Sequence, residues 1–156
     1  IIEQFAPLIG INVRTKNNLQ ARLDFKQDRN LSLNLSNSQV TETTNNDVSF
    51  DLGWTKTDLK LPFKIKGRTI SINNDVTFRM NFSIRDQKTV QRKLNGENTV
   101  TNGNRNFQMR PSIGYQLNNQ LDITAYFERS MTQPRVGSFD RASTAFGAQL
   151  RFNLAQ

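Results

Sequence analysis

The chain has 156 residues, a net charge of +8 and a hydrophobic fraction of 35%, and it contains neither cysteine nor histidine. It therefore lacks disulfides and thiolate metal sites, and also the commonest general base and transition-metal ligand. No run of about 18 apolar residues occurs, so we expect no transmembrane helix.

The basic residues are spread along the chain, with no basic block and no aromatic-plus-basic motif, so we expect no nucleic-acid partner. Disorder is the alternative for so polar a chain, but eleven phenylalanines and sustained alternation favour a folded sheet. The first residues, Ile1–Phe5, include no methionine and no basic-then-apolar leader. We therefore expect a processed chain or a piece of a longer one.

Apolar and polar side chains alternate with a period of two along most of the chain, most clearly from Asp75 to Gln87. This pattern puts apolar side chains on one face of a strand and polar ones on the other. Eight antiparallel strands are expected, at Leu8–Arg14, Leu19–Lys26, Leu31–Ser36, Val48–Trp54, Asp75–Gln87, Phe107–Tyr115, Leu121–Glu128 and Ala145–Phe152.

Asparagine-rich or polar segments separate these strands. Tight turns are expected at Lys16–Asn18, Asp28–Asn30 and Asn118–Asn119, polar loops at Thr41–Asp47, Lys93–Asn106 and Gln133–Arg141, and an irregular connection at Asp58–Asn74, where Pro62 cannot donate a ladder hydrogen bond. Long strands with one apolar face are typical of an outer-membrane β-barrel, in which short turns face the periplasm and long loops face outward. With eight strands, both termini are expected in the periplasm. The turns Asp28–Asn30 and Asn118–Asn119 and the connection Asp58–Asn74 then lie on the periplasmic side, opposite the three long loops.

The sequence therefore predicts an all-β fold: residues 1–156 form one segment of an antiparallel transmembrane β-barrel. Candidate lipid-facing residues are Leu23, Phe50, Phe78, Phe82, Ile123 and Leu150, and candidate lumen-facing residues are Arg22, Lys26, Arg79, Arg85, Arg110 and Arg151. The basic residues could steer a passing polypeptide, or could simply belong to a hydrated face, which also carries Asp24, Asp51, Asp122 and Glu128.

Aromatic side chains are expected near the strand ends, as in an interfacial girdle, although core aromatics of a soluble barrel are the alternative. They are Phe5, Phe25, Trp54, Phe107, Tyr115, Phe127 and Phe152. Candidate partner-binding residues in the long loops are Asn95, Gly96, Asn102, Gly103 and Arg135. No catalytic residue, metal site or cofactor is expected, because serine catalysis lacks its histidine and Asp122 and Glu128 lie about 20 Å apart on an extended strand.

Four segments resemble the C-terminal end of the SprA/Sov family, the outer-membrane translocon of type IX secretion in Bacteroidota. They are Asn30–Ser36 (NLSLNLS), Leu59–Gly67 (LKLPFKIKG), Phe82–Asp86 (FSIRD) and Leu150–Leu154 (LRFNL). The chain departs from the usual terminal aromatic of outer-membrane barrels, since Phe152 is followed by four more residues.

The resemblance implies that the chain forms the last strands of a very large barrel wall, in a system that exports folded proteins and supports gliding motility. It implies lipid, cargo protein, a plug and a cargo-shuttle barrel as partners. The alternatives are a self-contained eight-stranded outer-membrane barrel, acting as a porin or adhesin, and a soluble ligand-binding β-barrel.

Overall fold

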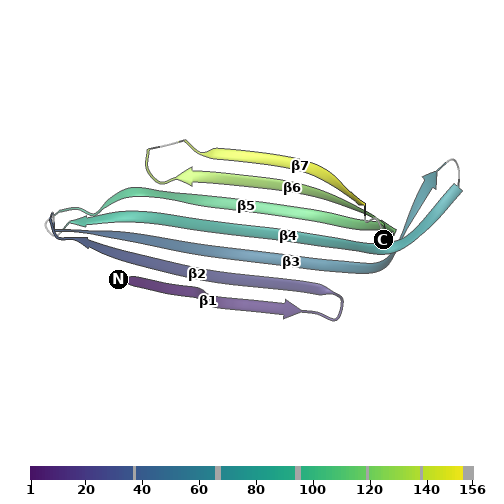
Figure 1. Ribbon diagram of the computed structural model, residues 1–156, viewed down its shortest axis with the longest axis horizontal. Coiled ribbons are helices and arrows are strands. Elements are labelled where there is room, and N and C mark those ends of the chain that lie inside the picture. Colours follow the sequence, from purple (N-terminus) through teal and green to yellow (C-terminus); the bar gives the residue numbers. More distant parts are fainter. Residues whose placement is uncertain (37, 66–67, 94–95, 119, 138, 153–156) are drawn as a thin grey trace.

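The computed structural model describes residues 1–36, 38–65, 68–93, 96–118, 120–137 and 139–152, without the side chains of 58–74 and 118. These residues form one antiparallel sheet of seven strands in chain order (Figure 1). The strands are β1 (Ile2–Arg14), β2 (Leu19–Asn34), β3 (Gln39–Ile65), β4 (Arg68–Lys93), β5 (Thr99–Asn118), β6 (Leu121–Pro134) and β7 (Arg141–Phe152). The all-β, antiparallel prediction is confirmed.

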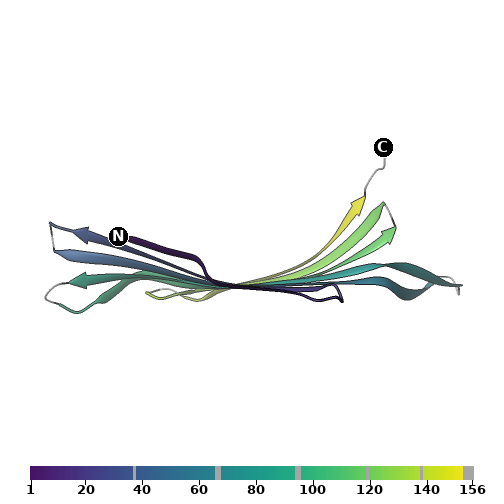
Figure 2. The ribbon, with the colours of Figure 1, turned by 90° about the horizontal axis from the view of Figure 1, so that it is seen from below.

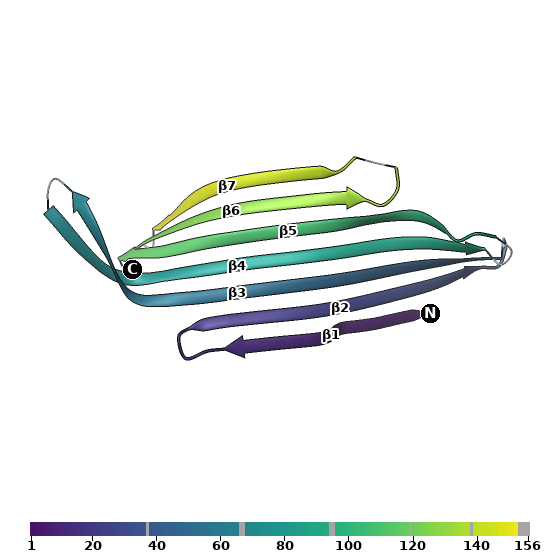
Figure 3. The ribbon, with the colours of Figure 1, turned by 180° about the vertical axis from the view of Figure 1, so that it is seen from behind.

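The sheet is a single layer. Views from opposite sides show no segment lying over either face (Figures 1 and 3). The edge-on view shows a strong twist, with β1–β2 and β6–β7 lifting away from the central strands at opposite ends of the molecule (Figure 2). Because no second layer packs on the sheet, no apolar side chain among the described residues is buried. That part of the chain also contains no helix long and apolar enough to cross a membrane.

The sheet is open. In the described part of the chain β1 pairs only with β2, and β7 pairs only with β6. Seven strands place the amino and carboxyl ends of the sheet at opposite ends of the molecule (Figure 1). The expectation of eight strands, with both termini at one end, is therefore wrong.

The missing strand boundary is at Asp28–Asn30, where a turn was expected. β2 passes straight through these residues, and Asp28 and Asn30 pair with Asn45 and Thr43 of β3. The alternation stays in phase across them, because Phe25, Arg29 and Leu33 all point to one face. The chain instead reverses between the end of β2 at Asn34 and the start of β3 at Gln39, and Ser38 has a φ of 51°.

The polar loop predicted at Thr41–Asp47 is also wrong. This segment belongs to β3 and is hydrogen-bonded on both sides, to β2 and to β4. Its three threonines suit a strand, since branching at Cβ favours extended backbone. Both faces of the sheet are polar here, so composition alone cannot separate strand from loop.

The irregular connection predicted at Asp58–Asn74 is a β3–β4 hairpin that extends beyond the rest of the sheet (Figure 1). A register shift between Lys56 and Leu59 marks where it leaves the sheet. Pro62 pairs with Ser71, in a region where β3 has β4 as its only neighbour. A proline is tolerated at such an edge position because one side of the strand needs no donor there.

Two loops are shorter than predicted. β4 ends at Lys93 and β5 begins at Thr99, so most of Lys93–Asn106 is paired strand. Likewise only 135–140 connects β6 to β7, instead of Gln133–Arg141. The turn at Lys16–Asn18 is confirmed, with Asn18 at a φ of 57°, and the chain also reverses between Asn118 and Leu121 as expected.

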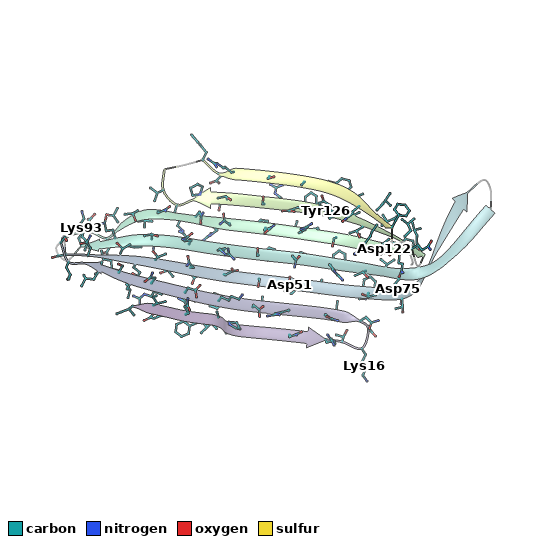
Figure 4. The ribbon with its side chains drawn as sticks, in the orientation of Figure 1. Lys16, Asp51, Asp75, Lys93, Asp122 and Tyr126 are labelled. Atoms are coloured by element: carbon teal, nitrogen blue, oxygen red, sulfur yellow. The ribbon has the colours of Figure 1, made fainter. Side chains whose placement is uncertain are left out.

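These connections lie at two ends of the sheet. One end carries 15–18, the β3–β4 hairpin and the β5–β6 reversal; the other carries 35–38, the β4–β5 connection and 135–140. Lys16 and Lys93 mark the two ends in Figure 4. The second end is called the loop end below.

β6 and β7 fit together through an aromatic ring lying over a glycine. Tyr126 pairs with Gly147, and a Cβ added at Gly147 would lie 2.6 Å from the Tyr126 ring. The Arg110 guanidinium carbon lies 5.2 Å from the centre of the same ring. The absence of a side chain at Gly147 therefore permits this stack.

We expect Gly147→Ala to lower the free energy of unfolding by about 1–3 kcal/mol, because Tyr126 must move off its partner. Gly53→Ala is the matched control: a Cβ there meets nothing within 4 Å, so the change should stay within about 0.5 kcal/mol. Urea unfolding monitored by tyrosine fluorescence measures both. Equal effects would show that the ring does not depend on Gly147.

Candidate functional site

One face of the sheet carries a continuous apolar surface. Register pairing across all seven strands puts the apolar positions on the same side; for example, Leu23 pairs with Phe50, and Phe50 with Phe82. The members of this apolar band are Phe5, Ile9, Ile11, Val13, Leu19, Ala21, Leu23, Phe25, Val48, Phe50, Leu52, Trp54, Val76, Phe78, Met80, Phe82, Ile84, Phe107, Met109, Pro111, Ile113, Tyr115, Leu121, Ile123, Ala125, Phe127, Phe146, Ala148, Leu150 and Phe152. All six candidate lipid-facing residues belong to it.

No described residue covers the apolar band. Phe146 is 79% exposed, Phe152 68% and Ile9 57%, although each is a large apolar side chain. The rings within the band contact one another, as Phe82 and Phe107 do edge to face at 5.3 Å. An apolar face of this extent has to meet another apolar medium or surface.

The band runs diagonally across the strands. A register row is the set of residues that pair with one another across the sheet. The band on β1 ends at Val13, and the row of Val13 reaches Phe146, where the band on β7 begins. The band on β7 then continues for six residues to Phe152, so it shifts by about one residue for each strand crossed. With about 3.4 Å per residue and 4.8 Å between strands, this slope corresponds to about 35°.

The seven aromatic side chains predicted near strand ends all lie on the face of the band, and six of them lie at its ends. Phe25, Trp54 and Phe107 lie well inside β2, β3 and β5, so their placement near strand ends is wrong. Phe5, Phe25 and Phe107 border the end nearer the loops, and Trp54 and Phe152 border the other. Phe127 ends the band on β6, where Arg129 follows it on the same face, and Tyr115 of β5 lies between Val76 and Ile123.

The opposite face is polar and carries all six candidate lumen-facing residues. Ion pairs neutralise three of them: Arg22 lies 2.7 Å from Asp24, Arg85 2.7 Å from Asp47, and Arg110 3.8 Å from Glu128. Lys26, Arg79 and Arg151 form no ion pair with any described residue. This face thus mixes both charges, as expected for a hydrated surface.

An open hollow lies on the polar face near the end opposite the loops. Asp75, Arg79 and Asp122 line it, around the small residues Gly114 and Thr124. Asp75 and Asp122 are labelled at this end in Figure 4. No cluster of three or more acidic side chains that could hold a metal ion occurs in the described part of the chain.

Two arginine–carboxylate clusters lie beyond the band at the loop end, on the face of the band. Glu42 accepts hydrogen bonds from Nε of Arg29 and Nε of Arg92, both at 2.6 Å, and is only 7% exposed. This cluster is not predicted from the sequence, because the pattern there indicates a loop at Glu42 and a turn at Arg29.

In the second cluster Asp86 accepts from Arg135 at 2.9 Å and from Arg105 at 3.3 Å. The sequence signal for this cluster was the position of Asp86, two residues after Ile84 and therefore on the same face of the strand. It places a carboxylate on the face of the band, immediately beyond its last apolar residue.

The hydrogen bond from Arg92, together with that from Arg29, lowers the pKa of Glu42, while burial acts in the opposite direction. The charged form of Glu42 is thereby stabilised in the folded protein. Its contribution to stability is present above the ordinary pKa of a glutamate and is lost as pH falls through the lowered value.

The five candidate partner-binding residues do not all lie in loops. Gly96 lies in the β4–β5 connection, and Asn95 lies outside the described residues. Asn102 and Gly103 are in β5, paired with Thr89 and Lys88, so their assignment to a loop is wrong. A Cβ at Gly103 would lie 2.5 Å from the Gln87 carbonyl oxygen, which explains the glycine there.

Arg135 lies in the 135–140 connection and meets β5 and β4. Its backbone N–H donates to the Gly103 carbonyl oxygen at 2.8 Å, while its guanidinium binds Asp86. Arg135 therefore ties the β6–β7 connection to the loop end of β4 and β5.

Comparisons with known proteins add no relative: no family model matches the chain, and no curated protein is significantly similar to it. The resemblance to the SprA/Sov family therefore stays a prediction from its four segments.

We expect Glu42→Gln to lower the free energy of unfolding at neutral pH by about 1–3 kcal/mol, because two guanidinium groups lose their charged acceptor. The difference from the unmodified chain should shrink in acid, where Glu42 is protonated in both states. Glu97→Gln, at an exposed position in the β4–β5 connection, is the control and should show neither effect. Urea titrations at neutral and acidic pH measure this. A pH-independent difference would exclude the charge of Glu42 as its cause.

Proposed function

We propose that this chain forms part of the wall of a protein-conducting pore in the bacterial outer membrane. The observation that carries the proposal is the uncovered apolar band on a single-layer sheet whose other face is polar. In a bilayer the band would contact hydrocarbon, and the polar face would line a hydrated lumen. No other described part of the chain offers the band a packing partner.

The dimensions of the band support this orientation. It spans seven or nine residues on each strand, or about 24–31 Å at about 3.4 Å per residue. Tilted by about 35°, this length projects to about 20–25 Å along the membrane normal. Outer-membrane barrels have apolar bands about 25 Å tall and strands tilted by about 35–45°.

The strand count supports an arc of a larger barrel over a small closed one. β1 and β7 run in the same direction, so joining these two edges would create a parallel pair in an otherwise antiparallel sheet. Bacterial single-chain barrels are antiparallel and even-stranded. Further strands beside at least one edge would pair the free backbone hydrogen-bonding groups of β1 and β7 and keep the sheet antiparallel.

The assignment to protein export rests on the resemblance to the type IX translocon family. The mixed charges of the polar face are compatible with a hydrated passage, through which folded cargo would pass without a strong fixed field. In this proposal the chain is structural and carries out no catalysis. Its partners would be membrane lipid, cargo protein, a plug and a cargo-shuttle barrel.

Single cysteines test the two faces in the native protein, because the chain itself contains none. Cysteines replacing Asn81 and Ser83 should react with a water-soluble maleimide. Those replacing Phe82 and Ile84 should not react in the membrane, since lipid excludes the charged reagent and keeps the thiol protonated, and should react once the protein is denatured. Asn98→Cys, in the β4–β5 connection, is the positive control.

Equal reaction of all four positions with the water-soluble reagent would exclude the membrane orientation. A nitroxide attached to Phe82→Cys or Ile84→Cys should collide with oxygen more often than with a water-soluble nickel chelate. Few collisions with either would instead mean that protein covers the band.

The arc proposal makes a separate prediction for residues 1–156 expressed alone. Unpaired backbone groups at β1 and β7 would cost several kcal/mol each in lipid, so the isolated sheet should aggregate instead of inserting. Heat-modifiability in gel electrophoresis and detergent size-exclusion measure this. A compact, heat-modifiable monomer of about 18 kDa would contradict the arc and favour a self-contained barrel.

A further inference from the structure

The loop end of the apolar face carries a concentration of basic side chains. Arg29, Lys88, Arg92 and Arg105 lie on the strands beyond the band, and Arg135 joins them from the 135–140 connection. These five residues are called the basic rim. Their acidic neighbours on this face are Glu3, Glu42, Asp86 and Asp140, the last of which lines a hollow with Arg105 and Arg135. The five basic side chains therefore exceed the acidic ones by one.

The ion pairs position the rim without exhausting its donors. Glu42 holds Arg29 and Arg92, and Asp86 holds Arg105 and Arg135, so each carboxylate is shared by two guanidinium groups. An arginine has five N–H donors. Each of these four arginines uses only one or two of them in its ion pairs. The side chains remain 34–53% exposed, so the other donors are open to a further acceptor.

Lys88 lies between the two clusters. On β4 the same face carries Asp86, Lys88 and Arg92, and the register row of Lys88 contains Thr44 and Gly103. Lys88 is exposed and forms no ion pair with any described residue. It adds an uncompensated charge at the centre of the rim.

The position of the rim identifies what it would meet. Ile84 and Phe107 are the last apolar residues of the band on β4 and β5. Asp86 and Arg105 lie one register row farther toward the loop end, about 6.8 Å along the strand. If the band lies in hydrocarbon, as proposed above, the next two rows, which carry Arg29, Lys88 and Arg105, lie at the level of the lipid headgroups. Arg92 lies eight residues, about 27 Å, beyond Ile84 and orders Arg29 through Glu42 from farther out. Phosphate is the anionic group at that level, and guanidinium binds it through paired hydrogen bonds.

We propose that the basic rim binds the phosphate groups of anionic lipids in the leaflet at the loop end. This inference rests on the membrane orientation proposed above and goes beyond it by naming a lipid class. Held by their carboxylates, the arginines are ordered before lipid arrives, which reduces the entropy cost of binding. Preferred lipids would thereby anchor the wall at a defined depth.

The test uses the native protein in vesicles of phosphatidylcholine containing spin-labelled phosphatidylglycerol or spin-labelled phosphatidylcholine. The fraction of immobilised label at the protein gives the selectivity. We expect about a fivefold preference for phosphatidylglycerol, the effect of one basic residue near an anionic surface. The combined variant Arg29→Gln, Lys88→Gln and Arg105→Gln should abolish it, while Glu42 and Asp86 each keep one arginine.

The matched control removes the same charge from the other face, as Lys26→Gln, Arg79→Gln and Arg151→Gln. It should keep the selectivity. Lys88→Gln alone breaks no ion pair among the described residues, so it should weaken the selectivity even if the combined variant fails to fold. Competition by inorganic phosphate at the ionic strength of a chloride control should leave the preference unchanged, since the membrane places the headgroup at the rim.

The inference would be overturned if the protein inserted but showed no preference for phosphatidylglycerol. It would also be overturned if the rim and control variants lost the preference equally. Both results would leave the membrane orientation standing. Loss of the preference to inorganic phosphate alone would show a free-phosphate site and overturn it too. Protein that fails to insert into vesicles of either composition would overturn both proposals.

Discussion

The structure depends on one constraint: the period-two alternation stays in phase across six strand interfaces. The register is unbroken through the apolar band from β2 to β5, so its rows join apolar to apolar, except at the edge of the band where Val76 pairs with Lys56. A slip of one residue at any interface would turn a whole strand over. No second layer corrects such an error, because the sheet has none. Strand pairing therefore has to specify the fold without help from a packed core.

A sheet with this construction is incomplete in water. Soluble domains bury their apolar face against another layer, and none of the described residues does so here. The same property suits a bilayer, in which hydrocarbon covers one face and water the other. The diagonal course of the band gives the proposal geometric support beyond composition, because the slant of about one residue per strand agrees with the strand tilt of known barrels.

Beyond the band the strands continue as a two-sided polar sheet. Here threonine, asparagine and glutamine pairs and the clusters of Glu42 and Asp86 take over the role of apolar contacts. Thr43 and Thr89, for example, share a side-chain hydrogen bond at 3.3 Å. The wall would thus project beyond the lipid surface as ordered strands, with the loops carried at their tips. Partners that approach this end would meet rigid sheet before they meet loops.

The sequence by itself determined that the chain is all-β, which residues share each face, and where two of the reversals lie. Those results follow from alternation, which exists only where the two faces meet different media. It could not separate strand from loop at Thr41–Asp47 or near Asn102, since a strand with water on both sides has the composition of a loop. Nor could it bring Glu42 together with Arg92, 50 residues away. Only the tertiary structure decided these points, because there the backbone is held by hydrogen bonds to neighbouring strands, and pairing across such distances leaves no local mark on either segment.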